Sequence, residues 1–211
     1  MDTKPQPSLQ DLIEIRSMME RSSRFISLSG LSGIAAGVCA LIGATVTYFL
    51  WGKRFYPLYE LIYTPGGALK KSALFTHVGI AVGVLIAALL SGIFFTTRKA
   101  KKQGIPVWGT ASKRLVVNLT IPLVTGGFFI CSLAFHQLTY LAAPCTLIFY
   151  GLALLNASKY TLDDIRYLGL SEIMLGLVAC VFTGYSLLFW AIGFGVMHIV
   201  YGITMYRKYD I

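Results

Sequence analysis

Residues 78–90 read VGIAVGVLIAALL, and this stretch decides the fold class. It contains no charged side chain, and its apolar residues show no period of two. A strand of a membrane barrel would alternate in polarity over about 10 residues. The stretch instead lies inside the longer apolar run Ser72–Thr97, which is long enough to cross lipid as a helix. The sequence therefore predicts a transmembrane helix here.

The composition extends this prediction to the whole chain. Of its 211 residues, 56% are hydrophobic and 13% are charged, and the mean hydropathy is +0.70. A soluble domain carries about 25% charged residues, so this chain lacks the charge for a water-compatible surface. Six apolar runs are long enough to span the hydrocarbon core as helices, in which the backbone satisfies its own hydrogen bonds. They are Phe25–Trp51, Ser72–Thr97, Leu115–His136, Thr139–Ala157, Tyr167–Tyr185 and Leu188–Tyr206.

We therefore expect an all-α polytopic membrane protein with two parts. Residues 25–211 form a six-helix transmembrane domain. Residues 1–24 form a cytoplasmic tail in which apolar and basic side chains recur at helical spacing, which predicts an amphipathic helix on the membrane surface. A helix that simply continues the first span into the cytosol is an equal alternative.

Basic residues predict the orientation, because short loops rich in Lys and Arg stay in the cytoplasm. With the N-terminus inside, fourteen of the eighteen Lys and Arg residues fall on the cytoplasmic side. Only Lys53, Arg54, Lys70 and Lys71 fall outside. Both termini are therefore expected in the cytoplasm, and the net charge of +9 largely follows from this topology.

Two pairs of segments indicate an internal repeat. Gly30–Trp51 matches Gly169–Trp190 at seven of 22 positions without gaps. Residues 148–151 (IFYG) and 199–202 (IVYG) match at an offset of 51 residues, which is also the offset from Asn118 to Gly169. The pattern predicts three helical hairpins repeated in parallel.

Small residues predict where helices pack closely, because association in lipid depends on close contact. Gly33 and Gly37 form one small-residue face in the first span, and Gly79 and Gly83 form another in the second. The two faces lie at opposite depths, so we do not expect them to meet. Contact within the chain or a homodimer would bury them.

Ionisable residues inside a span are costly and usually face a cavity or a partner. Of the nine carboxylates only Glu172 falls in a predicted span, and His198 falls in the sixth. At a rise of 1.5 Å per residue their depths differ by about 5 Å, so the two side chains could be hydrogen-bonded neighbours. Further polar side chains at compatible levels complete the predicted ligand-binding set: Asn118, Tyr150, Tyr201 and Ser32.

Two interpretations of this set stay open. In the first, Glu172 reaches water or Arg166, and His198 packs between helices. In the second, both line a polar pocket open to the cytoplasm, where a histidine beside a carboxylate can take up a proton near neutral pH. The function predicted from the second is binding or translocation of a small or amphipathic ligand. The alternative is a non-catalytic scaffold or sensor that acts through its cytoplasmic loops.

Motifs for catalysis or metal binding are missing from the sequence. The three histidines stand singly, without H-E-x-x-H, and no G-x-S-x-G is present. The four cysteines fall inside predicted spans without C-x-x-C spacing. We therefore expect no metal site, no cofactor and no enzymatic activity, with an intramembrane enzyme as a third hypothesis.

The loop from Arg98 to Arg114 carries six basic residues around an apolar segment. A polybasic stretch is attracted to anionic headgroups, and a tryptophan can lie among them. We expect this loop to lie on the inner membrane surface without binding nucleic acid. The predicted headgroup contacts are Arg98, Lys99, Lys101, Lys102 and Trp108.

Four stretches resemble a family of small, uncharacterised bacterial inner-membrane proteins. They are residues 22–34 (SSRFISLSGLSGI), 121–127 (IPLVTGG), 143–169 (APCTLIFYGLALLNASKYTLDDIRYLG) and 194–203 (FGVMHIVYGI). The resemblance covers nearly the whole chain and implies a bacterial inner membrane and six helices, with no assigned activity. The three-hairpin layout is also similar in architecture to small stress-associated membrane proteins of the HdeD type.

Overall fold

The computed structural model describes residues 29–51, 62–64, 70–104 and 106–210. The predicted tail of residues 1–24 lies outside these ranges, as do Lys53 and Arg54. The long helices are α2 (Gly30–Leu50), α4 (Lys71–Lys102), α5 (Thr110–Phe135), α6 (Ala142–Ala157) and α7 (Asp164–Val181). A last rod contains α8 (Ser186–Trp190), the π-helical segment η4 (Ala191–Met197) and α9 (His198–Tyr209). Short 3-10 turns precede or follow α6 and α8: η1 (Thr139–Leu141), η2 (Ser158–Tyr160) and η3 (Thr183–Tyr185).

The described part of the chain is built from helices of membrane-crossing length. Five helical segments are long and apolar enough to cross a membrane: Gly30–Leu50, Lys71–Lys102, Thr110–Phe135, Thr139–Tyr160 and Thr183–Tyr209. The helix α7 is not among these five: its 18 residues include Asp164, Arg166 and Glu172, whereas each of the five has an 18-residue stretch with at most two charged side chains. The all-α fold class predicted from the sequence is therefore confirmed for the described residues, and five helices long and apolar enough to cross a membrane are compatible with a membrane protein.

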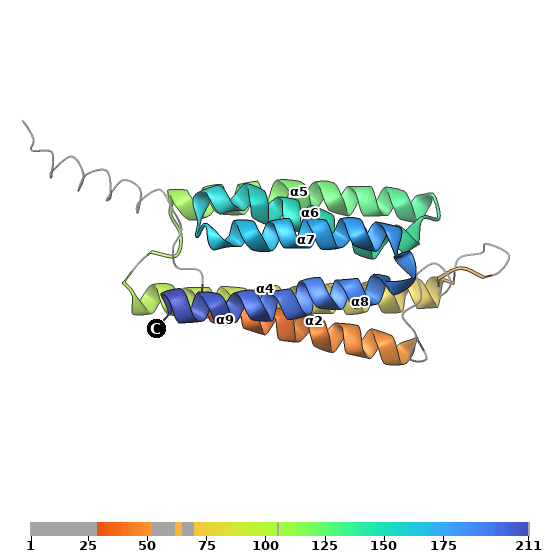
Figure 1. The fold of residues 1–211 in the computed structure, drawn as a ribbon, viewed down its shortest axis with the longest axis horizontal. Helices are drawn as coiled ribbons and strands as arrows, with labels where there is room; N and C mark the ends of the chain where they lie inside the picture. Colours follow the sequence, from red (N-terminus) through yellow and green to blue (C-terminus); the bar gives the residue numbers. More distant parts are fainter. Residues whose placement is uncertain (1–28, 52–61, 65–69, 105, 211) are drawn as a thin grey trace, which may run out of the picture.

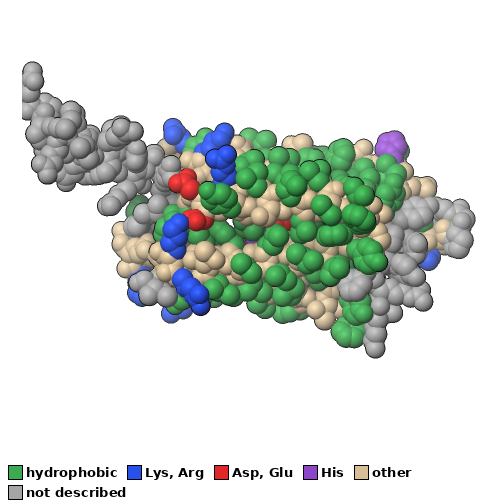
Figure 2. Space-filling model, in the orientation of Figure 1, with side chains coloured by type: hydrophobic (Ala, Val, Ile, Leu, Met, Phe, Trp, Pro, Cys, Tyr) green, Lys and Arg blue, Asp and Glu red, His purple; other side chains and the backbone are tan. Residues whose placement is uncertain are grey.

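Apolar side chains cover the long sides of the molecule (Figure 2). Large side chains such as Phe75, Phe128 and Val181 are more than 70% exposed. Lys and Arg side chains gather mainly toward one end of the face shown in Figure 2. A surface that is apolar along the helices and charged at the ends is the pattern expected of a bundle solvated by lipid.

The helices form two layers of three (Figure 1). One layer contains α5, α6 and α7, and the other contains α2, α4 and the α8–η4–α9 rod. The last described helix therefore packs against the first described one, since α9 and η4 lie along α2. The two layers meet where α8, η4 and α9 face α6 and α7, a contact we call the seam.

Glycines allow the closest helix contacts within each layer. A Cβ placed on Gly202 would lie 2.6 Å from the backbone nitrogen of Ile34 and 2.7 Å from the Gly30 carbonyl oxygen. In the other layer, a Cβ on Gly151 would lie 2.5 Å from the carbonyl oxygen of Gly169. Gly30 and Gly169 are matched positions of the predicted repeat, and so are Gly202 and Gly151. The three-hairpin repeat itself stays a prediction.

The two predicted small-residue faces have different surroundings. Gly33 and Gly37 pack on the last rod, where a Cβ on Gly37 would lie 2.6 Å from the Gly195 carbonyl oxygen. Around Gly79 and Gly83 a Cβ would meet no heavy atom within 4 Å. The first face is thus buried inside the chain, and the predicted homodimer stays a prediction for the second.

Candidate functional site

Glu172, His198 and Tyr150 meet at the seam between the two layers. Glu172 comes from α7, Tyr150 from α6, and His198 is the first residue of α9. Glu172 Oε1 lies 3.5 Å from His198 Nδ1, and the Tyr150 hydroxyl lies 2.8 Å from His198 Nε2. We call these three residues the seam cluster. It joins the layers through polar groups in the hydrophobic part of the bundle.

The glutamate of the seam cluster is fully enclosed by protein. Its exposed fraction is 0%, and neither carboxyl oxygen has a hydrogen-bond partner within the described residues. Gly193 faces it from the opposite layer, where a Cβ would lie 2.5 Å from Oε2 and 2.5 Å from Leu147 Cδ2. Any larger residue at position 193 would therefore displace the carboxyl group, the Leu147 side chain or the rod itself.

The π-helical segment η4 positions the imidazole of His198. His198 Nδ1 lies 3.0 Å from the carbonyl oxygen of Gly193, five residues earlier in the chain. The hydrogen-bond network fits the neutral tautomer in which Nδ1–H donates to Gly193 and Nε2 accepts from Tyr150. Phe194 of the same segment stacks on the imidazole with ring centroids 5.9 Å apart. Single π-helical turns inside α-helices are frequent at functional sites.

Polar groups continue from the seam cluster toward one end of the bundle. Tyr201 lies one turn after His198 and packs, with Tyr150, against the buried Leu154, Ile165 and Leu168. Its hydroxyl oxygen is buried without a hydrogen-bond partner among the described residues. Tyr201 also lies within electrostatic reach of Tyr150, Asp164 and Tyr209.

At the end of this row Asp164 receives two donors from the last turn of α9. The Tyr209 hydroxyl donates to Oδ2 at 2.8 Å, and Lys208 Nζ lies 3.0 Å from both carboxyl oxygens. Partial burial would raise the pKa of Asp164, but the hydrogen bonds from Tyr209 and Lys208 outweigh burial and lower it below the usual value.

Asp210 connects the same end of α9 to its own layer. The Asp210 carboxylate accepts hydrogen bonds from the Ser29 hydroxyl and the Gly30 N–H, both at 2.9 Å. Its other oxygen lies 2.5 Å from Lys99 Nζ. Because Lys208, Tyr209 and Asp210 follow one another, the last described residues bind α7 of one layer and both α2 and α4 of the other.

Two members of the predicted ligand-binding set lie away from the seam cluster. Asn118 on α5 donates to the Arg114 carbonyl oxygen, and its own carbonyl oxygen accepts from Asn156 of α6 at 2.9 Å. Ser32 donates to the Ser29 carbonyl oxygen of its own chain turn. The structure thus brings together Glu172, His198 and Tyr150, with Tyr201 beside them.

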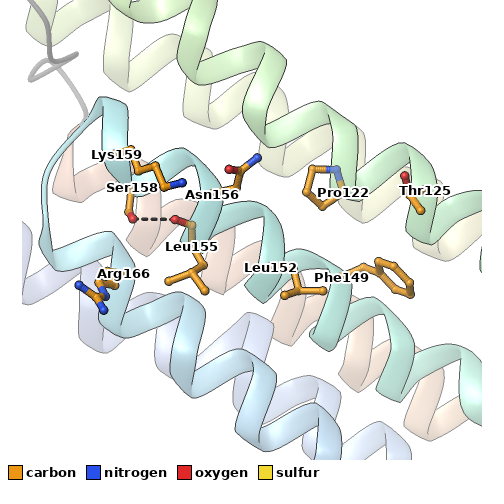
Figure 3. Close-up of a pocket in the computed structure, with 9 residues that line it drawn as sticks. All are labelled: Pro122, Thr125, Phe149, Leu152, Leu155, Asn156, Ser158, Lys159 and Arg166. Atoms are coloured by element: carbon orange, nitrogen blue, oxygen red, sulfur yellow. Dashed lines mark hydrogen bonds between the residues drawn. The ribbon is translucent and has the colours of Figure 1, made fainter.

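A pocket of about 710 Å³ lies instead between α5, α6 and the start of α7 (Figure 3). We call it the lateral groove. Figure 3 shows Lys159 and Arg166 at one end and Phe149 toward the other. The lining residues are Pro122, Thr125, Phe149, Leu152, Leu155, Asn156, Ser158, Lys159 and Arg166.

The lateral groove has an unneutralised basic end and an apolar body. Within the described residues neither Lys159 nor Arg166 forms an ion pair, and both are exposed. From the sequence, Lys159 is interpreted only as a topology signal, and Arg166 as a topology signal and a possible partner of Glu172. The sequence signal for the groove was that Lys159 and Arg166 lie seven residues apart on either side of a turn between two helices. Such a short turn places both side chains at the same end of the helix pair.

The predicted headgroup residues end α4 and follow it. Arg98, Lys101 and Lys102 are exposed, whereas Lys99 is engaged with Asp210. Trp108 is 64% exposed. Lipid contact by this loop stays a prediction, and the Asp210 ion pair gives Lys99 a role within the protein.

The described residues contain no group of three His, Cys, Asp or Glu side chains that could hold a metal ion. The four cysteines are free thiols. His77 instead contacts Trp51, whose indole N–H donates to the imidazole. No family model, curated protein or solved structure matches this chain.

Proposed function

We propose that this protein binds an anionic amphipathic lipid in the lateral groove. The observation that carries the proposal is the pairing of Lys159 and Arg166 with an apolar channel between α5 and α6. An anionic headgroup would lie against the two cations, which attract it electrostatically. One acyl chain would follow Leu155, Leu152 and Phe149 toward the middle of the bundle. Asn156 and Ser158 offer further polar contacts near the headgroup.

The proposal includes a sixth span and an orientation. We propose that α7 crosses the membrane between α6 and α9, so that both termini lie in the cytoplasm of a bacterial cell. The fourteen basic residues assigned to the inner side support this orientation. The cationic end of the lateral groove then faces the inner leaflet, where anionic lipids are attracted by basic residues.

Orientation is tested by cysteine labelling in spheroplasts. His136 and Gln103 are exposed at opposite ends of the bundle, and each is replaced by cysteine in a background without the four native cysteines. An impermeant thiol reagent should label position 136 and spare position 103. Labelling with the reverse pattern would invert the proposed orientation and place the groove at the outer leaflet.

Lipid binding is tested with the purified full-length chain and two lipids. The probe is phosphatidylglycerol, compared with zwitterionic phosphatidylcholine, with retention measured by native mass spectrometry. Each charge near the headgroup contributes about 1 kcal/mol, so the variant K159Q/R166Q should bind phosphatidylglycerol about 30-fold more weakly. Phosphatidylcholine binding should change little.

Two matched controls separate the groove from the general surface. The variant K113Q/R207Q removes the same charge from the same end of the bundle but outside the groove, and it should retain phosphatidylglycerol like the wild type. Leu152→Trp should fill the apolar channel and weaken binding, whereas Leu177→Trp on the exposed face of α7 should not. Equal effects within either pair would refute a specific site in the groove.

A further inference from the structure

The carboxyl group of Glu172 in the seam cluster cannot be ionised without a positively charged partner. Glu172 is fully buried, and within the described residues neither of its oxygens accepts a hydrogen bond. The imidazole of His198 faces it, with Nδ1 3.5 Å from Oε1. An ionised carboxylate in such a place would lose its hydration without any compensating donor, which is the costliest state for a buried acid. The carboxyl group is therefore stable only if a proton is held on it or on the facing imidazole.

The neighbours of Glu172 leave His198 as its charge partner. Tyr150 of α6 hydrogen-bonds to the imidazole, and Tyr201 lies one turn further along α9. The segment η4 has no ionisable side chain and faces Glu172 with Gly193, whose carbonyl oxygen contacts His198. The charged groups Asp164 and Lys208, together with Tyr209, lie at the end of the row and bind one another. Among the described residues no lysine or arginine forms an ion pair with Glu172.

We propose that Glu172 and His198 form a binding site for a single proton, reached from the Asp164 end of the bundle through Tyr201 and Tyr150. The pair is neutral overall when it holds this proton, either as a carboxylic acid beside a neutral imidazole or as a carboxylate beside an imidazolium. The inference does not depend on lipid binding in the lateral groove.

The hydrogen bonds of His198 provide a balanced route for the proton. Tyr150 transfers its hydroxyl proton to Nε2 and takes a replacement from a water molecule on the Tyr201 side, which in turn receives a proton from bulk water at the Asp164 end, so the imidazole becomes cationic and the tyrosine is unchanged. The Nδ1–H bond then breaks as the proton passes to Oε1 of Glu172, and the imidazole is left neutral with its hydrogen on Nε2. No step needs an oxidant, a metal or a cofactor.

The location of the site gives the proton a structural effect. Glu172 and Tyr150 belong to one layer, and His198 and Gly193 belong to the other. Loss of the proton would leave a net negative charge inside the seam, which favours entry of water and separation of the layers. The proton thus acts as a ligand that holds the two layers together.

The decisive measurement finds where the proton is. The full-length chain is prepared in lipid nanodiscs with isotope-labelled glutamate and histidine. Infrared spectra then report carboxylic acid against carboxylate for the four glutamates, and nitrogen NMR reports the charge of the three histidines. At neutral pH the wild type should show either a protonated Glu172 or a cationic His198. An ionised Glu172 beside a neutral His198 would overturn the proposal.

Variants assign the signals and test their dependence on each other. Glu172→Gln should remove whichever signal reports the bound proton, the carboxylic acid band of Glu172 or the charge of His198, whereas Asp163→Asn, which changes an exposed carboxylate at the start of α7, should change neither signal. His198→Gln leaves Glu172 without a partner, so its carboxylic acid band should be present at neutral pH. Spectra of Glu172→Gln identical to wild type, or an ionised Glu172 in His198→Gln, would refute the shared site. If a variant fails to fold, the wild-type spectra alone still decide.

Exchange of the bound proton for deuterium tests the route. Tyr201→Phe removes one hydroxyl from the row and should slow exchange severalfold, measured at whichever group holds the proton. Tyr206→Phe is the matched control, because Tyr206 is an exposed tyrosine on the same helix. Equal exchange rates in the two variants would overturn the route through Tyr201.

Discussion

The contact between α2 and α9 predicts that Gly202→Ala destabilises the protein. A Cβ at position 202 would lie 2.6 Å from the Ile34 nitrogen and 2.7 Å from the Gly30 carbonyl oxygen. Ordinary van der Waals contact begins at 3.4 Å, and both obstacles are backbone atoms that cannot rotate away. The helices must therefore move apart by about 0.8 Å along this face.

The loss of stability depends on the contacts between α2 and α9 that are weakened when the helices move apart. Overpacking a close contact by one methyl group costs about 1–3 kcal/mol, because neighbouring side chains lose contact when the backbones separate. Gly33 and Gly37 lie along the same interface, so the separation extends over two turns of α2. In lipid, close packing is the main force between helices, which favours the upper part of this range.

Thermal unfolding of the purified chain in one detergent measures the effect. Gly92→Ala is the matched control, because it makes the same chemical change on α4, where a Cβ meets no heavy atom within 4 Å. Gly202→Ala should unfold several degrees below the wild type, and Gly92→Ala should not. Equal midpoints for the two variants would refute the argument from close contact.

Three further predictions follow from the C-terminal end of α9 and from the seam. Asp210→Ala removes the carboxylate that Lys99, the Ser29 hydroxyl and the Gly30 N–H contact, and it should lower the free energy of unfolding by about 1–3 kcal/mol, measured by denaturation. Asp210→Asn should lose less stability than Asp210→Ala, because the amide oxygen still accepts a hydrogen bond. The lowered pKa of Asp164 means that its contribution to stability is complete above the usual carboxyl pKa and is lost as the pH falls through the lower folded value. Unfolding midpoints measured against pH should therefore fall less steeply in acid for Asp164→Asn, and parallel curves would contradict the hydrogen bonds to Tyr209 and Lys208. Gly193→Ala should destabilise more than Gly184→Ala in the same assay, because only position 193 faces Glu172 and Leu147.

Hydropathy located the helices well and their ends less well. The second predicted span, Ser72–Thr97, corresponds to α4, which extends from Lys71 to Lys102. The helix continues through Arg98, Lys99, Lys101 and Lys102 because basic side chains can remain helical outside the hydrocarbon while their stems cover apolar surface. Hydropathy marks the part of a helix that crosses lipid, so the charged extension could not be read from it.

Counting residues along each helix predicted the depth of the site residues, but it did not predict the direction in which their side chains face. A rise of 1.5 Å per residue placed Glu172 and His198 at similar levels, and the structure places them 3.5 Å apart. The same argument placed Asn118 and Ser32 at similar levels, but they face other neighbours. Depth follows from counting residues, whereas the direction that a side chain faces depends on how all the helices pack. The π-helical segment depends on that packing too, and no local pattern in the sequence marked it. Of the lateral groove, only the spacing of Lys159 and Arg166 could be read from the sequence.

The pairing of α2 with α9 has a consequence for the order of assembly during synthesis. Chains are made from the N-terminus, and early segments fold before later ones exist. The glycine face of α2, formed by Gly30, Gly33 and Gly37, therefore stays uncovered until residues 186–210 have been synthesised. The helices α5, α6 and α7 can associate earlier. Asp210, which accepts a hydrogen bond from the Gly30 N–H and contacts Lys99, is synthesised after all of these helices. A chain that ends before residues 186–210 leaves the glycine face of α2 exposed. A membrane quality-control protease can distinguish such a chain by this exposed face.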